Sequence, residues 1–317
     1  VISEQTKYAL TKNLGYNRDN VVFFNQDGGI EDDNKPFFTE LRRIPGVLNA
    51  SGTSHTLLGQ MSNTSGLDWP GKAPDERILF ENIRVDYEFH KTIGLDVLMG
   101  RWFDKSYGAD SLKIVLNESA VKAMGFTVEE AVGQNLTIWD EYDVSIIGVV
   151  KDFHYRSIHT PVDPPFFWLG ETWRVAVKLE KGKEVATMKE IEALHQKFSP
   201  GFIFDFEFLD KGYDKLYNSE RRVGTLSSYF AGFAIIISCL GLFGLASYTA
   251  ERRLKEIGIR KVLGASVSQI VLMLSKDFTK LVIIAIVLAL PVSYFFMSAW
   301  LEDFAYKIEL DATFFLI

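Results

Sequence analysis

Two long uncharged runs dominate the pattern of hydrophobic and polar positions along this chain. Residues 225–250 and 281–301 carry no Asp, Glu, Lys or Arg. A helix of roughly 20 apolar residues crosses the core of a bilayer, whereas a helix in the core of a soluble protein rarely needs so long an uncharged run. The pattern therefore predicts a membrane protein with spans at about 225–250 and 281–301.

The charges around these runs predict the topology. Overall the chain is acidic, with a formal charge of −7. Residues 251–280, however, hold seven lysines and arginines against three acidic residues. Short basic loops stay on the cytoplasmic side of a membrane. We therefore expect 251–280 to be a cytoplasmic loop and the large N-terminal region to lie on the other side.

The N-terminal region contains two similar strand–helix–strand units. The expected elements are a strand at 21–24, a helix at 36–43 and a strand at 47–53, then a strand at 173–179, a helix at 184–198 and a strand at 202–209. In the last strand Phe202, Phe204, Phe206 and Phe208 share one face because side chains alternate. Two such units predict a split, ferredoxin-like layer, with residues of about 60–165 inserted into it.

The inserted segment predicts elements of its own. A strand at 113–116 is followed by Asn117, a good cap for a helix at 118–124, and Thr127 with Glu130 forms a capping-box pattern. Strands at 136–139 and 144–150 read as a hairpin. The predicted fold class is thus an α+β domain over 1–222, with a small inserted α/β lobe, joined to an α-helical transmembrane region over 223–317. A helix over 211–222 is expected to continue into the first span.

We find no catalytic, cofactor-binding or metal-binding motif. The chain has no P-loop and no His-Glu-x-x-His pattern. Its histidines (His55, His90, His154, His159 and His195) are scattered. Asp152-Phe153-His154 could be a pair of ligands, but a structural turn is favoured, and for Glu31-Asp32-Asp33 a solvated loop is favoured over a cation site. The one cysteine, Cys239, lies within the first span.

Small residues in the first span suggest a helix-packing surface. Gly232, Gly241 and Gly244 would let another helix approach closely. The alternative is the ordinary richness of membrane helices in glycine, and the sequence does not separate the two interpretations.

The basic loop carries the most specific pattern in the chain. Gly258 and Gly264 interrupt its helical pattern. Ser266 is a suitable N-cap for a following helix that presents Ile270, Val271 and Leu274. A basic amphipathic segment of this kind can lie on the inner membrane surface. It can also dock on a cytoplasmic partner.

From Arg252 to Ala265 the loop resembles the signature of MacB/FtsX-like ABC transporter permeases, with Glu256-Ile257-Gly258-Ile259-Arg260-Lys261 and Leu263-Gly264-Ala265. Four further segments resemble the same family in the same order: Gly100-Arg101-Trp102-Phe103, Val115-Leu116-Asn117-Glu118, Gly148-Val149-Val150-Lys151-Asp152-Phe153-His154 and Asp303-Phe304-Ala305-Tyr306. So does Cys239-Leu240-Gly241-Leu242-Phe243-Gly244-Leu245-Ala246. The resemblance implies four spans with a MacB-like periplasmic core domain between the first and second. On that pattern the chain lacks the first span and enters the last from about 312.

The resemblance also implies a function. Such permeases sit in the bacterial inner membrane as multi-pass homodimers or with a related permease, and a separate cytoplasmic ATPase supplies ATP hydrolysis. Closure of the ATPase is transmitted to the periplasmic domains, a mechanism called mechanotransmission, which serves efflux, export or extraction of antibiotics, peptides or lipoproteins. The implied ATPase-coupling residues are Arg252, Glu256, Ile257, Gly258, Ile259, Arg260, Lys261, Gly264 and Ala265. The resemblance implies no enzymatic activity in this chain and no cofactor.

Expected partners are therefore the ATPase, a second permease, membrane lipids and, in some members of the family, a periplasmic adaptor or substrate protein. The acidic, aromatic-rich outer domain does not favour nucleic acid. The alternative hypothesis is a membrane-anchored periplasmic sensor or binding protein. A sensor needs a cytoplasmic output domain, and the 251–280 loop is too short to be one.

Overall fold

The computed structural model describes residues 1–11, 14–58, 62–108, 110–154, 164–311 and 314. Its contacts divide the chain into two compact units. Residues Thr11–Tyr217 form an α+β unit, and Val1–Leu10 with Asn218–Ile317 form a helical unit. An α+β domain joined to a helical region of membrane-spanning length is the predicted fold class, which is confirmed.

The α+β unit is built on the expected ferredoxin-like layer. Its elements are β1 (Val21–Asn25), α2 (Gly29–Asp32), α3 (Asn34–Leu41), β2 (Val47–Thr53), β11 (Arg174–Leu179), α7 (Glu184–Phe198) and β12 (Phe206–Phe208). The strand order is β12-β1-β11-β2, and each neighbouring pair is antiparallel. Strands β1 and β2 are therefore parallel with β11 between them, the arrangement of a split βαβ unit.

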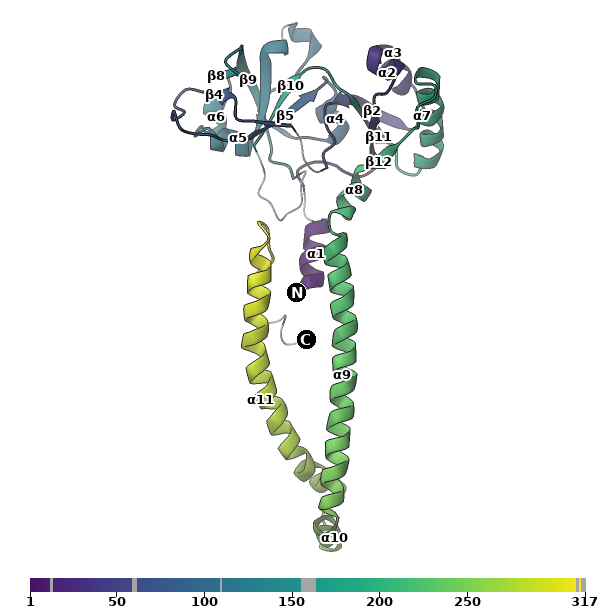
Figure 1. The fold of residues 1–317 in the computed structure, drawn as a ribbon, viewed down its shortest axis with the longest axis vertical. Helices are drawn as coiled ribbons and strands as arrows, with labels where there is room; N and C mark the ends of the chain where they lie inside the picture. Colours follow the sequence, from purple (N-terminus) through teal and green to yellow (C-terminus); the bar gives the residue numbers. More distant parts are fainter. Residues whose placement is uncertain (12–13, 59–61, 109, 155–163, 312–313, 315–317) are drawn as a thin grey trace. The chain divides into compact units, whose positions relative to one another are not determined.

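Helices α3 and α7 cover this layer and bury its apolar face (Figure 1). Phe24 of β1 meets Phe37 of α3 edge to face at 6.2 Å, and Ile191 of α7 is fully buried in the same cluster. Burying a side chain of this size stabilises the fold by about 1.5–3 kcal/mol. Helix α3 begins at Asn34, two residues before the predicted start, because the Asp33 carboxylate caps it by accepting from the Lys35 N–H at 3.2 Å.

The last strand is shorter than its alternating phenylalanines suggest. Strand β12 begins only at Phe206, while Phe202 is 48% exposed and Ile203 is 86% exposed in the preceding turn. The aromatic row persists without the strand, since the Phe204 ring lies 5.1 Å from that of Phe24 and 5.3 Å from that of Phe206. Ring packing therefore holds the segment where strand hydrogen bonds do not.

The inserted lobe lies between β2 and β11, as predicted. It consists of β3 (Ser62–Thr64), β4 (Leu67–Asp68), β5 (Phe80–Val85), α4 (Phe89–Ile93), β6 (Val97–Gly100), β7 (Lys113–Asn117), α5 (Glu118–Ala123), α6 (Val128–Ala131), β8 (Asn135–Ile138), β9 (Tyr142–Val150) and β10 (Pro165–Leu169). Asn117 caps α5, Thr127 and Glu130 form the predicted capping box, and β8 pairs with β9 as a hairpin. The lobe packs around its own apolar core.

One sheet runs through both the ferredoxin-like layer and the inserted lobe, but few contacts join its strands where the two meet. Strand β5 continues the order from β2 through β10, β7, β9 and β8 to β4. Strands β2 and β5 meet at one registered pair, Thr53 with Val85. Two backbone hydrogen bonds flank it, from the Ser54 N–H to the Arg84 carbonyl at 2.8 Å and from the Asp86 N–H to the Gly52 carbonyl at 3.1 Å. We call this place the β2–β5 joint.

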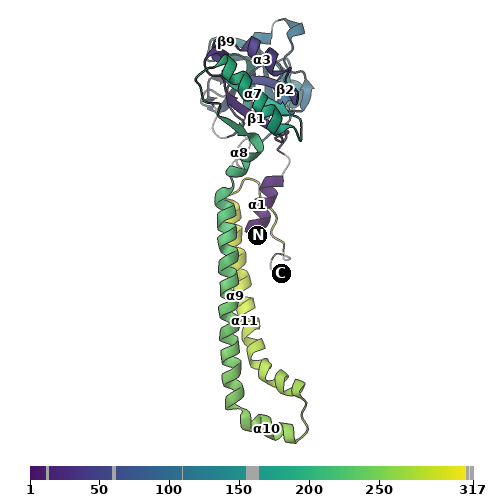
Figure 2. The ribbon, with the colours of Figure 1, turned by 90° about the vertical axis from the view of Figure 1, so that its right-hand side faces the viewer.

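The helical unit contains α1 (Ile2–Thr11), α9 (Asn218–Arg252), α10 (Leu254–Val262) and α11 (Val267–Glu302) (Figure 2). Two stretches, Asn218–Arg252 and Phe278–Glu302, are long and apolar enough to cross a membrane, and the most apolar part of each is 0% buried. The second predicted span and the part of the loop from Val267 onward thus form one helix, because the Ser266–Gln269 capping box starts α11 at Val267. The further span expected from 312 lies almost wholly outside the described residues.

The helix expected over 211–222 is interrupted. Helix α8 (Leu209–Lys215) ends in a tight turn in which the Leu216 and Tyr217 N–H groups bind carbonyls three residues back, at 3.1 and 3.2 Å. Tyr213 and Tyr217 are fully buried and their hydroxyl groups lie 3.1 Å apart. Burial of this tyrosine pair within the α+β unit overrides the helical pattern.

The Gln5 side chain joins the beginning of the helical unit to the backbone after α11. Gln5 is 0% exposed. Its Nε2 donates to the Tyr306 carbonyl at 2.9 Å, and its Oε1 accepts from the Ile308 N–H at 2.9 Å. The glutamine amide therefore pairs with the backbone after α11 as a neighbouring strand would.

Candidate functional site

The family-like loop forms a compact elbow, which we define as residues 252–270. Helix α10 turns away from the direction of α9 (Figure 2) and ends in a Schellman motif. The Ala265 N–H bonds to the Arg260 carbonyl at 3.0 Å, and the Gly264 N–H bonds to the Lys261 carbonyl at 3.2 Å. Gly264 has a φ of +91°, a left-handed conformation that favours glycine. Gly264 thus sets the direction in which the chain enters α11.

Two weak electrostatic contacts involve the charged side chains of the elbow. Glu256 pairs with Arg260 one helical turn later at 2.9 Å, and both side chains are about half exposed. Such an exposed pair contributes only about 0.3–0.5 kcal/mol. The Arg252 guanidinium lies 5.5 Å from the Tyr248 ring centroid. These charges are therefore not needed to hold the elbow together and remain accessible to a partner.

The predicted coupling residues divide between two sides of α10. Ile257 is half-buried, whereas Gly258 and Ile259 are exposed, Ile259 by 63%. No atom outside the local helix backbone lies within 4 Å of a Cβ built on Gly258. Leu254, Val262 and Leu263 are also more than 60% exposed. An exposed apolar surface of this kind beside basic residues is typical of an interaction site.

A recess of about 490 Å³ opens at the junction of α10 and α11 within the elbow. Arg260, Gly264 and Ala265 line it with Leu263, Gln269 and Ile270. The first three were predicted coupling residues, and the last three were not among them. Leu263 enters the site because the Schellman turn directs it there, and the first turn of α11 supplies Gln269 and Ile270.

The predicted helix-packing glycines face no atom within 4 Å in the single chain. Gly232 and Gly241 are nine residues apart, which is two and a half turns of an α-helix, so they lie on opposite sides of α9. A single seam can include Gly241 and Gly244 but not Gly232 as well.

The family-like segments of the α+β unit converge on β9 and have structural roles. The Arg101 N–H donates to the Ile147 carbonyl at 2.9 Å, and a Cβ on Gly148 would collide with the Arg101 carbonyl. Asp152, just after β9, accepts from the Ser119 N–H at 2.8 Å and from the Ser119 hydroxyl at 2.6 Å. The carboxylate of Asp152 is thus occupied at the start of α5, which supports a structural turn over a ligand pair.

A buried ion pair fixes the segment after β6. Arg101 binds Asp110 through both terminal nitrogens at 2.7 Å, and the Asp104 N–H adds a third bond at 3.0 Å. The Asp110 side chain is 2% exposed and that of Arg101 is 29% exposed. The hydrogen bonds from Arg101 outweigh burial and lower the pKa of Asp110.

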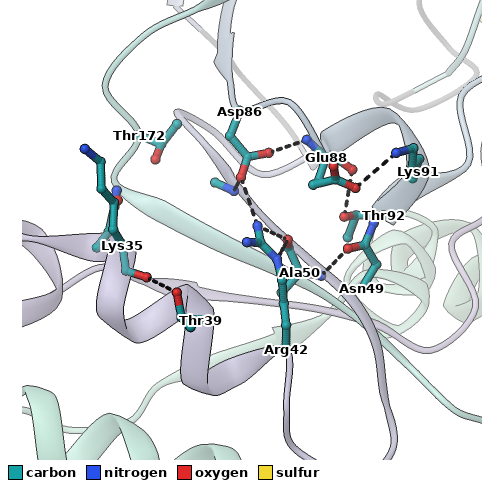
Figure 3. A network of polar contacts seen from close by, with 12 residues as sticks. Lys35, Thr39, Arg42, Asn49, Ala50, Asp86, Glu88, Lys91, Thr92 and Thr172 are labelled. Atoms are coloured by element: carbon teal, nitrogen blue, oxygen red, sulfur yellow. Dashed lines mark hydrogen bonds and ion pairs between the residues drawn. The ribbon is translucent and has the colours of Figure 1, made fainter. Parts of the chain in front are cut away.

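A second polar network holds the β2–β5 joint (Figure 3). The Asp86 carboxylate accepts from the Gly52 N–H at 2.9 Å and from the Glu88 N–H at 3.0 Å, and it lies 3.6 Å from Arg42. Arg42 also donates to the Ala50 carbonyl at 2.8 Å. Burial raises the pKa of Asp86 to about 6, against the opposing effect of these donors. No sequence motif pointed to Asp86 or Arg42, which are 44 residues apart.

The described residues hold no group of three or more His, Cys, Asp or Glu side chains suited to a metal ion. Asp33 in the acidic loop serves as a helix cap. His195 is buried against Phe24 and Phe204, and His55 and His90 lie at separate places in the α+β unit. His159 lies outside the described residues.

Comparison with known proteins identifies the helical unit. The family model of the FtsX-like permease C-terminal region matches residues 228–317, which include most of α9 and all of α10 and α11. No curated protein matches the chain at a significant level.

Solved structures of low identity resemble the α+β unit. The periplasmic region of MacB from Actinobacillus actinomycetemcomitans is 16% identical with a TM-score of 0.45, over 66% of this chain and 98% of that one. The extracellular domain of the ABC-type transporter YknZ from Gram-positive bacteria is 13% identical with a TM-score of 0.42, over 59% and 97%. A permease-protein domain from Porphyromonas gingivalis is 17% identical with a TM-score of 0.41, over 60% and 88%.

The family assignment rests on the permease match, which coincides with the exposed elbow and with both helices of membrane-spanning length. Residues 228–317 of the chain belong to the FtsX-like permease C-terminal family.

Proposed function

We propose that this chain is the membrane subunit of an ABC transporter and couples ATP hydrolysis by a separate ATPase to movement of its α+β unit. The observation that supports this proposal best is the FtsX-like match over a segment whose elbow is exposed and weakly tied to the rest of the chain. In this proposal the α+β unit is periplasmic, the protein spans the inner membrane several times, and it acts as a dimer with itself or a related permease. The transported or extracted substrate is an envelope molecule such as an antibiotic, a peptide or a lipoprotein.

The coupling contact in this proposal is the elbow. An apolar surface from Ile259 and Val262 and a basic one from Arg260 and Lys261 suit a groove with acidic edges on a cytoplasmic partner. A motion imposed on α10 would pass to α9 and α11, because short hydrogen-bonded turns connect the three helices. Near α10 the Arg253 N–H bonds to the Thr249 carbonyl at 3.2 Å, and the Schellman motif closes the other end.

Co-purification tests the proposal. The full-length protein is tagged, solubilised gently from its native membrane and analysed for stoichiometric partners and ATPase activity. We expect an ABC ATPase to co-purify. Arg260→Glu, which would place a carboxylate against the acidic edges, and Gly258→Leu should each reduce the bound ATPase and its activity by at least about tenfold, since a displaced interface anchor costs about 2 kcal/mol or more.

A matched control separates a lost contact from a damaged fold. Glu180 and Lys183 form an exposed ion pair at 2.8 Å in the α+β unit, similar in exposure to that of Glu256 and Arg260. Glu180→Lys should therefore leave the amount of bound ATPase unchanged. A stable, folded preparation without any ATPase would contradict the proposal and favour a membrane-anchored sensor.

A further inference from the structure

A polar recess lies at one edge of the ferredoxin-like layer, where β1 and β2 end and β11 begins. Its volume is about 490 Å³, and its lining includes Asp27, Glu31, Ser54, His55, Trp173 and Arg174. Because β11 lies between β1 and β2, Arg174 is central. The two carboxylates follow β1 on one side, and Ser54 and His55 follow β2 on the other.

The floor of the recess is held by a buried glutamine. Gln26 is 3% exposed, and its Nε2 donates to the Thr172 hydroxyl at 2.9 Å and to the Arg174 carbonyl at 3.0 Å. Its Oε1 accepts from Asn34 at 3.0 Å. With every polar atom of the Gln26 side chain bonded, the loop after β1 is fixed to the start of β11. The recess is thus largely preformed, which reduces the entropic cost of binding.

The charged groups around this floor do not pair with one another. In the described parts of the chain, the Arg174 guanidinium and the carboxylates of Asp27 and Glu31 form no ion pair or side-chain hydrogen bond, although all three line the same recess. Other half-exposed charges of this unit do find partners, as Lys197 does with Glu40 at 2.6 Å. One cation and two anions are therefore available to a ligand in one small volume.

An aromatic wall stands beside these charges. The Trp173 side chain is 44% exposed, and its ring meets the His55 ring edge-on at 5.6 Å. The Ser54 hydroxyl lies 2.8 Å from His55 Nδ1 and orients the imidazole. Burial and the nearby Arg174 charge lower the pKa of His55, so its ring stays neutral near pH 7 and adds no second cation.

We propose that this recess binds a zwitterionic, peptide-like ligand, namely an amino acid or a short peptide. Arg174 binds the carboxylate, Asp27 and Glu31 bind the ammonium group, and Trp173 packs on an apolar side chain. A simple anion would meet two carboxylates for one guanidinium, and an apolar ligand would leave all three charges unpaired. The volume lies within the roughly 300–1,000 Å³ of small-molecule sites. The inference does not depend on the proposed function, because binding requires no ATPase.

Isothermal titration calorimetry tests the site. The titrated protein is the full chain in lipid nanodiscs, and the probe is the dipeptide L-alanyl-L-phenylalanine. Matched probes are its N-acetyl derivative, which lacks the ammonium group, and its C-terminal amide, which lacks the carboxylate. Each probe lacks one charge-assisted hydrogen bond, so removing either charge should weaken binding at least about tenfold.

Protein variants match the probes. Arg174→Gln should weaken the free dipeptide at least about tenfold but leave the C-terminal amide almost unaffected, since the amide has already lost the same contact. The double change Asp27→Asn with Glu31→Gln should likewise weaken the free dipeptide at least about tenfold. It should leave the N-acetyl probe almost unaffected, since that probe already lacks the ammonium group. Trp173→Ala should weaken all three probes. Lys181→Gln, an exposed change beyond the far end of β11, is the control and should change none of them.

Two results would overturn the inference. One is an absence of binding by the free dipeptide at millimolar concentration to protein whose circular dichroism and thermal unfolding are normal. The other is equal binding of the free, acetylated and amidated probes. In the second case the recess would recognise the apolar side chain rather than the zwitterion.

Discussion

The Arg101–Asp110 pair allows an asymmetric prediction, because its two members differ in exposure. Removing one partner of a buried pair leaves the other charge without compensation. After Arg101→Ala the stranded group is the Asp110 carboxylate, which is 2% exposed and retains the hydrogen bond from the Asp104 N–H. After Asp110→Ala it is the Arg101 guanidinium, which is 29% exposed and can reach water.

We therefore expect Arg101→Ala to be the more damaging change. Breaking a buried pair costs about 3–5 kcal/mol, and we assign the upper part of this range to Arg101→Ala and the lower part to Asp110→Ala. Arg101→Ala also removes the stacking of the guanidinium on the Tyr107 ring at 3.8 Å, which is worth about 0.5–1 kcal/mol at an exposed site. The double variant should cost less than the sum of the two by at least about 2 kcal/mol.

Urea unfolding of the full chain in detergent, followed by tryptophan fluorescence, measures these values. Trp102 is next to the pair and five of the six tryptophans lie in the α+β unit, so the signal reports on this unit. Lowering the pH should reduce the deficit of Arg101→Ala, since protonation neutralises the stranded carboxylate. The reasoning fails if Asp110→Ala is as damaging as Arg101→Ala, or if the two changes are additive.

Three further predictions concern other sites. Burial raises the pKa of Asp86 from 3.8 to about 6, so the folded state holds this proton more tightly than the unfolded state. Wild type should therefore lose about 2 kcal/mol of unfolding free energy relative to Asp86→Asn as the pH rises from about 4 to 7; parallel pH profiles from urea unfolding would contradict this. Gly148→Ala should cost about 1–3 kcal/mol in the same assay because its Cβ meets the Arg101 carbonyl, and an unchanged midpoint would mean that β9 yields there. Gly264→Ala should destabilise the elbow by about 1–2 kcal/mol because Gly264 has a left-handed φ, and amide hydrogen exchange after α10 should become faster. Gly258→Ala should instead slow amide exchange in α10, since alanine is favoured over glycine by about 1 kcal/mol at a helical position with free space around it.

Local signals in the sequence predicted much of the fold. Asn117, Thr127 and Ser266 cap the helices they were expected to cap, because a capping side chain and its N–H partner are three residues apart and no tertiary contact is needed. The two strand–helix–strand units could also be predicted, because each is one continuous segment whose helix returns the chain to the same layer. Prediction failed where tertiary burial decided, as with Tyr213 and Tyr217, which break the expected helix.

Prediction of the two candidate sites also depended on whether their residues are neighbours in the sequence. The elbow could be located from its glycines and charges because it is one continuous segment, although Leu263, Gln269 and Ile270 joined it only through the turn at Gly264. The recess at the start of β11 combines Asp27, which follows β1, His55, which follows β2, and Arg174, the first residue of β11. No spacing in the sequence brings these residues together, because strand order, rather than distance along the chain, makes them neighbours.

The β2–β5 joint makes the inserted lobe an exchangeable module. The register of the ferredoxin-like layer is set by β11 against β1 and β2, and one residue pair passes this register on to the lobe. A lobe of different size or shape can therefore be accommodated if it provides a strand end opposite Thr53, a carboxylate for the Gly52 N–H, and a helix that packs against β2 and β11 as α4 does. In evolutionary terms, the inserted lobe is the part of the α+β unit most free to diversify, because it has its own apolar core.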